Sequence, residues 1–244
     1  MKEYIRTLKE LIRVNKNELI LYGATPLIGA VIGIVMVFVI MSVDGSGEDY
    51  GELGSFVAAL MGGIALVIGQ IFGIQTEFNI AISMGMARKN YMPAKYTLLV
   101  IETLMIIFIV SVTGWIEGGL YTAVYPGSIC ELNASAWLSY PVLVISVILG
   151  LPALIMLLGL LLMIFGQKFF WIIWALWMVG CIGGPRIIHA VTEKPESIVG
   201  RLGILIIDFV KNSSTIGMVI CTCIVIAAIW IADFILCRRQ RVTG

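Results

Sequence analysis

Long apolar runs alternate with short charged segments along this chain. Five runs of membrane length contain no Asp, Glu, Lys or Arg, and a sixth contains only Glu102. About 20 mostly apolar residues are needed to cross ~30 Å of hydrocarbon. The pattern therefore predicts six transmembrane helices, at 19–43, 54–78, 96–116, 138–165, 169–185 and 214–236.

Composition leads to the same class of protein. Of the 244 residues, 60% are hydrophobic and only 13% are charged, whereas soluble domains have roughly 45–50% apolar and about 25% charged residues. No low-complexity tract or clear internal repeat interrupts the pattern. We expect an all-α polytopic membrane protein in which 1–244 form a single transmembrane domain.

The basic residues indicate the orientation, because Lys and Arg accumulate on the cytoplasmic side of a membrane. With the amino terminus inside, twelve of the 16 Lys and Arg lie in inner segments and four lie in outer ones. The first outer loop is purely acidic, with Asp44, Glu48, Asp49 and Glu52. We therefore expect both termini to be cytoplasmic, in a multi-pass protein of the cell membrane.

The first 18 residues have a periodic charge pattern. Their basic residues are spaced alternately four and three apart, which places them on one helical face, whereas Ile5, Leu8, Leu11 and Ile12 occupy the neighbouring face. This is typical of an amphipathic helix on the inner leaflet; a solvated charged tail is the alternative. The expected membrane-surface anchors are Lys2, Arg6, Lys9, Arg13 and Lys16.

The segment 186–213, between the fifth and sixth predicted spans, is also amphipathic. Its apolar residues share one helical face, while Arg201, Asp208 and Lys211 share another. It contains too many charges to span the membrane. We expect a re-entrant or interfacial outer helix here, with an ordinary surface connector as the alternative.

Small and polar residues within the spans predict helix contacts and a candidate solute path. Small residues four apart let membrane helices approach closely; such seams are offered by Thr25, Gly29 and Gly33, and by Gly69 and Gly73.

Polar residues inside the spans form the candidate translocation path, which consists of Gln70, Glu77 and Glu102. An acid at the depth of Glu102 needs a partner or water, so Glu102 is alternatively a protonated or hydrogen-bonded packing group, for example one that faces a basic residue of another helix. For Asp233, close to Arg238 and Arg239, an interfacial ion pair or snorkelling to the interface is the simpler interpretation.

The sequence contains no recognisable motif for catalysis or metal binding. The single histidine, His189, excludes sites that need two imidazoles, and the five cysteines show no ligand spacing. There is no phosphate-binding loop of the GxxxxGK[ST] type. We expect no catalytic residues, no metal, no cofactor bound by this chain and, because the basic residues form no stripe, no nucleic-acid partner.

The segment between the second and third predicted spans carries a family resemblance. It reads Asn79-Ile-Ala-Ile-Ser-Met-Gly-Met-Ala-Arg-Lys-Asn-Tyr-Met-Pro93, interpreted as a short inner helix followed by a turn. It resembles the first cytoplasmic loop of ABC-2 type permeases, the membrane subunits of bacterial ATP-binding-cassette exporters, which has a Ser-x-Gly-x-Ser-Arg-aromatic character. Ser83, Gly85, Arg88 and Tyr91 match, while Ala87 replaces the usual hydroxyl residue.

The resemblance implies a role for several parts of the chain. Residues 79–92 would be the loop that couples to a separate cassette ATPase, present in two copies and holding ATP and Mg, and residues 184–212 would form an external gate. A second permease copy, expected to be identical, would complete the path. The implied coupling residues are Ser83, Met84, Gly85, Arg88, Lys89 and Tyr91.

Size and an apolar path extend the resemblance to exporters of amphipathic substrates. Small permeases of this size resemble exporters of cytolytic or antimicrobial peptides, including the phenol-soluble-modulin exporters. Two other functions remain open from the residues themselves. They are an ion- or proton-coupled secondary transporter that uses Glu102, and a membrane scaffold or immunity factor that moves no solute.

Overall fold

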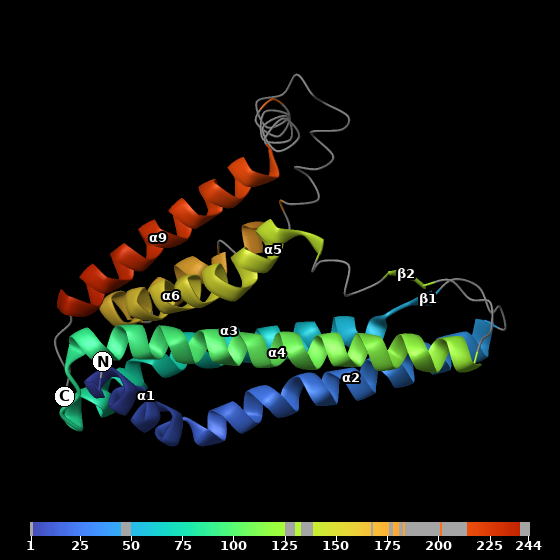
Figure 1. The fold of residues 1–244 in the computed structure, drawn as a ribbon, viewed down its shortest axis with the longest axis horizontal. Coiled ribbons are helices and arrows are strands. Elements are labelled where there is room, and N and C mark those ends of the chain that lie inside the picture. Colours follow the sequence, from blue (N-terminus) through green and yellow to red (C-terminus); the bar gives the residue numbers. More distant parts are fainter. Residues whose placement is uncertain are drawn as a thin grey trace.

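A computed structural model describes residues 2–44, 50–124, 130–132, 139–166, 168–175, 178–180, 183, 201 and 214–239. This part of the chain is almost entirely helical, as Figure 1 shows. Its only strands are β1 (Tyr50–Gly51) and β2 (Cys130–Leu132), a short parallel pair that joins the two loops in which they lie. The all-α class predicted from the sequence is correct apart from this pair.

Three long helices form the main layer of the molecule. They are α2 (Lys16–Asp44), α3 (Leu53–Ser83) and α4 (Arg88–Val124), which pack side by side in alternating directions. At 1.5 Å per residue α4 is roughly 55 Å long, well beyond the ~30 Å of hydrocarbon. The span predicted at 96–116 is therefore only the middle part of α4, whereas the span predicted at 54–78 covers α3 except for its first residue and its last five residues.

A second layer covers one side of α3 and α4. It consists of α5 (Pro141–Ile145), the π-helical segment η2 (Ser146–Gly150), α6 (Leu151–Phe165) and α9 (Thr215–Arg239), of which the first three form one continuous rod. Helix α9 packs against α6 and α5 and touches α4. Most of its apolar surface is exposed in this chain.

Within the described residues, five helices are long and apolar enough to cross a membrane: Lys16–Val43, Leu53–Ser83, Arg88–Val124, Pro141–Phe165 and Thr215–Arg238. They correspond to five of the six predicted spans. The remaining span, 169–185, coincides with a shorter apolar helix, Lys168–Gly180, of which 168–175 and 178–180 are described. The predicted outer helix, 186–213, lies outside the described residues apart from Arg201.

The amino-terminal helix α1 (Lys2–Val14) packs on the beginning of α4. Leu11 is only 1% exposed and Leu8 packs against the same core, while the Tyr4 hydroxyl lies 2.8 Å from Thr97 Oγ1. The expectation that Leu8 and Leu11 face lipid is therefore wrong, because protein covers them. Only Ile5 and Ile12 of that predicted apolar face stay exposed.

Glycines explain how closely α2 and α3 approach one another. A Cβ atom at Gly33 would lie 2.5 Å from the Leu53 carbonyl oxygen, and one at Gly29 would lie 2.8 Å from that of Val57. The predicted seam of Gly29 and Gly33 is thus confirmed, as a contact within the chain. Gly69 also meets α2, at Tyr22, whereas Gly73 has only the Glu77 side chain nearby, so the prediction for Gly73 is wrong.

Candidate functional site

The turn between α3 and α4 is a tight corner that backbone hydrogen bonds hold in place. The Met86 amide donates to the Ala81 carbonyl at 3.0 Å and the Gly85 amide donates to the Ile82 carbonyl at 2.9 Å, which is the Schellman pattern of a helix end. Gly85 has φ +80°, a conformation that only glycine adopts without strain. The predicted separate short helix in 79–92 is wrong, because α3 continues to Ser83 and α4 begins at Arg88.

Five of the six residues predicted for coupling lie at the surface of this corner. Ser83, Gly85 and Lys89 are exposed, Met84 is 50% exposed and Arg88 is half-buried. Tyr91 is fully buried, and its ring packs edge-on against Phe78 with the ring centroids 5.3 Å apart. Tyr91 therefore supports the corner from inside, and the expectation that it is a docking contact does not hold for this structure.

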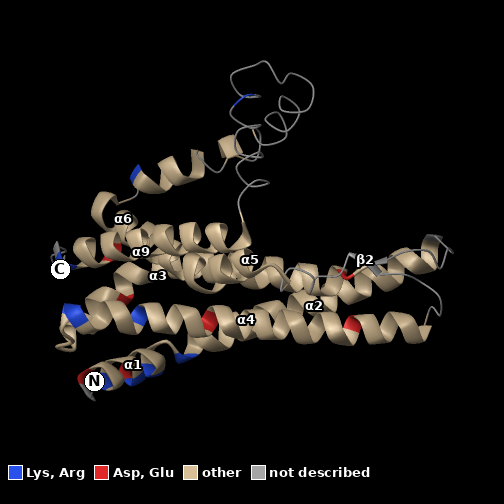
Figure 2. Cartoon of the chain, turned by 45° about the horizontal axis from the view of Figure 1, so that its top comes forward, with Lys and Arg blue, Asp and Glu red and all other residues tan. Residues whose placement is uncertain are grey.

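The corner and α1 together form the basic end of the molecule. Figure 2 shows Lys and Arg positions gathered on α1 and at the nearby ends of the long helices, with almost no basic positions along the rest of those helices. On α1, Arg6 donates to Glu10 in an exposed ion pair of 2.9 Å. The predicted surface residues Lys9, Arg13 and Lys16 are exposed as well. The side chain of Lys2 lies outside the described residues.

A buried polar cluster lies about two to four helical turns into the bundle from the corner, and we call it the inner network. Lys95 of α4 is fully buried; it pairs with Glu77 of α3 and donates to Gln70 Oε1 at 2.6 Å. The amide nitrogen of Gln70 in turn donates to Glu102 Oε2 at 3.0 Å. The structure thus brings the three candidate path residues together, around a lysine.

Asn15 completes the inner network from the joint between α1 and α2. Its amide nitrogen donates to Glu77 Oε2 at 2.9 Å, in a buried contact. The inner network therefore ties α3 and α4 to the joint that holds α1. Sequence reasoning missed Asn15 and counted Lys95 only as an inner surface charge. The sequence did contain a signal for the buried role of Lys95: it precedes Glu102 by seven residues, so both lie on the same face of one helix.

Glu102 lies inside the helix bundle, as its alternative interpretation as a packing group requires. It is 0% exposed, and its link to Lys95 runs through Gln70 rather than through a direct ion pair. Its second oxygen, Oε1, has no hydrogen-bond partner among the residues that the structure describes. A buried carboxyl group with one such oxygen is able to accept or exchange a proton or to bind a donor group.

A second buried acid caps the opposite end of α3. Glu117 of α4 accepts hydrogen bonds from the amides of Gly54 and Ser55, at 2.7 and 2.9 Å, and from the Tyr121 hydroxyl at 2.8 Å. A carboxylate suits this position because the first amides of a helix are unpaired and carry partial positive charge. Sequence reasoning missed Glu117, because the predicted span ended at residue 116.

Asp233 of α9 differs from its prediction. It is fully buried, and within the described part of the chain neither of its oxygens has a hydrogen-bond partner. Arg238 lies instead over the ring of Phe234, 5.0 Å from its centroid. The expected interfacial ion pair is therefore wrong for Arg238.

Comparisons with known proteins identify no relative of this chain. No family model matches the chain, and no curated protein or solved structure matches it.

Proposed function

We propose that this chain is the membrane-spanning subunit of an ATP-driven exporter. A separate cassette ATPase, in two copies, would hold ATP and Mg, and a second copy of this chain would complete the path. The substrate would be amphipathic, with a cytolytic or antimicrobial peptide as the best candidate. The chain moves it by alternating access, in the cell membrane, with both termini cytoplasmic.

The α3–α4 corner is the single observation that carries this proposal. It offers exposed Met84 and Lys89 at the end of two long helices that enter the membrane without a break. A corner held by two backbone hydrogen bonds and by the buried Tyr91 ring moves with its helices. A push from a closing ATPase dimer would then shift α3 and α4 as a rigid body.

The inner network supports transmission of such a push toward the middle of the membrane. Its hydrogen bonds join the α1–α2 joint to α3 and α4 at Asn15, Glu77 and Lys95, and continue inward to Glu102. Because these groups are buried, separating them would expose unpaired charge in an apolar interior. The helices that carry them are therefore favoured to move together.

Reversal of one surface charge tests the coupling role. We expect Lys89→Glu to fold normally, to weaken association with the proposed cassette ATPase, and to abolish substrate-stimulated ATP hydrolysis in liposomes. Lys168→Glu is the matched control, because Lys168 is also an exposed lysine but belongs to another segment of the chain. Full stimulation in the Lys89 variant would remove the coupling role, and lack of any complex with the ATPase would remove the proposal.

Glu102 favours a second candidate function, an ion- or proton-coupled secondary transporter. The observation behind it is the fully buried carboxyl group with one oxygen that lacks a described partner. Such a transporter would work in liposomes that contain only this chain, driven by a proton gradient without ATP. Loss of that activity in Glu102→Gln would establish it, and absence of any gradient-driven flux in the unmodified protein would exclude it.

A further inference from the structure

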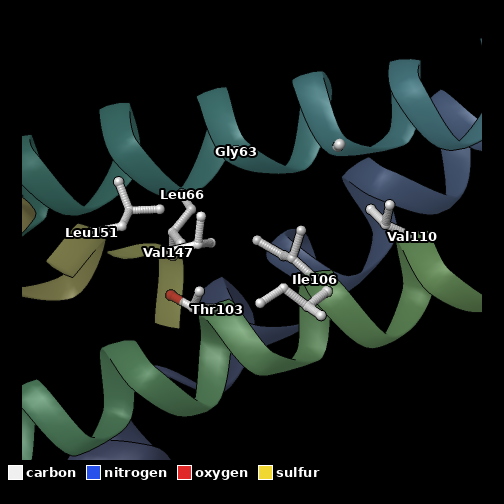
Figure 3. A pocket seen from close by; sticks show the side chains of 9 residues that line it. Gly63, Leu66, Thr103, Ile106, Val110, Val147 and Leu151 are labelled. Atoms are coloured by element: carbon white, nitrogen blue, oxygen red, sulfur yellow. The ribbon is translucent and has the colours of Figure 1, made fainter. Parts of the chain in front are cut away.

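A cavity of about 320 Å³ lies between the two layers of the molecule, outward from the inner network (Figure 3). Its walls come from α3, α4, η2 and α6, and they include Leu66, Ile106, Val110, Val147 and Leu151. The only polar side chain that lines it is Thr103, whose hydroxyl already donates to the Leu99 carbonyl at 2.8 Å. The cavity therefore favours hydrocarbon and offers no strong site for a free polar molecule.

Glycine creates part of this space. Gly63 lines the cavity, and a Cβ atom built on it meets no heavy atom within 4 Å. A larger side chain at position 63 would therefore occupy the cavity without disturbing the helix contacts. This makes Gly63 a position at which the cavity can be filled while the fold is kept.

The cavity is adjacent in the helices to the incompletely paired acid of the inner network. Ile106 of the cavity wall lies one turn outward from Glu102 on α4, and Leu66 lies one turn outward from Gln70 on α3. Glu102 Oε1 has no partner among the described residues, and Glu102 is linked to Lys95 only through the neutral amide of Gln70. A ligand with a cationic group would supply the missing partner.

The depth of the site distinguishes a lipophilic cation from an ordinary membrane lipid. Thr103 follows Arg88 by 15 residues in one continuous helix, a distance of roughly 22 Å. Polar headgroups stay at the surfaces of a bilayer whose hydrocarbon is ~30 Å thick. A lipid would bring only a chain end to this place, and its headgroup would leave Glu102 without a partner.

We propose that this cavity and Glu102 together bind a lipophilic cation, with its hydrocarbon in the cavity and its ammonium group at the Glu102 carboxylate. The inference rests on the proposed function, since the hydrocarbon that it places in the cavity would be an alkyl chain or large side chain of an amphipathic, cationic substrate. Binding itself needs only this chain. Failure of the site is therefore distinguishable from failure of the coupling to an ATPase.

A photoreactive dodecylamine tests the site in nanodiscs that contain the purified full chain. We expect saturable labelling of peptides that line the cavity, with excess dodecylamine competing at least about tenfold better than dodecanol, which corresponds to roughly 1.4 kcal/mol. Gly63→Leu should abolish this labelling. Gly119→Leu is the matched control, because a Cβ atom there also meets nothing within 4 Å but Gly119 lies outside this cavity.

Separate results test the role of Glu102 and the binding of hydrocarbon in the cavity. Glu102→Gln should keep the labelling and remove the preference for the amine over the alcohol. Equal competition by amine and alcohol in the unmodified chain would overturn the role of Glu102. Labelling that cannot be saturated, or that persists in Gly63→Leu, would show that a bilayer acyl chain fills the cavity and would overturn the site.

Discussion

Removal of Lys95 is the perturbation that most sharply tests the inner network. Lys95 is fully buried, pairs with Glu77 and donates to Gln70. In Lys95→Met the methionine fills a similar volume, but Glu77 is left as a buried carboxylate without its cationic partner, although it still accepts from the Asn15 amide. Breaking a buried pair from one side costs about 3–5 kcal/mol.

The double variant separates the charge from the packing. Lys95→Met combined with Glu77→Gln removes both charges while keeping the side-chain volumes, and the amide oxygen introduced at position 77 still accepts from Asn15. We expect the double variant to be destabilised by less than about 1.5 kcal/mol, because replacing both partners of a buried pair is often nearly neutral. The stabilities of the two single variants are thus strongly non-additive.

Thermal unfolding in detergent gives the readout. For a chain of this size each kcal/mol shifts Tm by roughly 2–4 °C, so Lys95→Met should lower Tm by about 6 to 20 °C. Lys89→Met, at an exposed lysine of the same helix, should change the free energy of unfolding by less than about 0.5 kcal/mol. A Lys95→Met variant as stable as the Lys89 control, or additive effects in the double variant, would refute the assignment of the network.

Three further predictions concern other contacts, each measured by thermal unfolding in detergent. Gly33→Ala should cost about 1–3 kcal/mol, because its Cβ would lie 2.5 Å from the Leu53 carbonyl, whereas Gly63→Ala has open space and should be neutral or stabilising; equal effects would contradict the seam. Ala87→Ser should add about 1 kcal/mol by capping α4, since Ala87 precedes its first residue and accepts from the amides of Asn90 and Tyr91; no gain would mean that residue 87 is not the cap. Glu117→Gln should cost about 1–3 kcal/mol, because an amide nitrogen would face the first amides of α3, and a neutral result would contradict the capping role.

The sequence predicted the helices well because membrane length and apolar composition leave few alternatives. The seam of Gly29 and Gly33 followed from the same reasoning, since close approach needs small residues. The residues at which the helices begin and end were harder to predict from the sequence. Lys95 was taken as the inner border of a span, yet a lysine is stable inside a bundle when an acid lies opposite, and Glu77 lies on another helix.

Neither of the two buried polar clusters could be predicted from the sequence, and the reason is the same for both. Asn15 and Glu77 are 62 residues apart, and Gly54 and Glu117 are 63 apart, so neither contact leaves a local pattern. Glu102 was nevertheless recognised as an acid in need of a partner. The structure supplies that partner as the amide of Gln70, which agrees with the interpretation of Glu102 as a hydrogen-bonded packing group; the basic residue given as an example of such a partner is not its direct contact.

Cross-linking from the α3–α4 corner tests the central proposal most directly. Met84→Cys, in a chain whose native cysteines are replaced, places a thiol at a residue that is 50% exposed at the corner. With a bifunctional maleimide reagent we expect a covalent product with the cassette ATPase that changes in yield when ATP is added. Absence of that product, together with modification of the thiol by a membrane-impermeant maleimide added outside intact cells, would place the corner on the wrong side of the membrane and contradict the account.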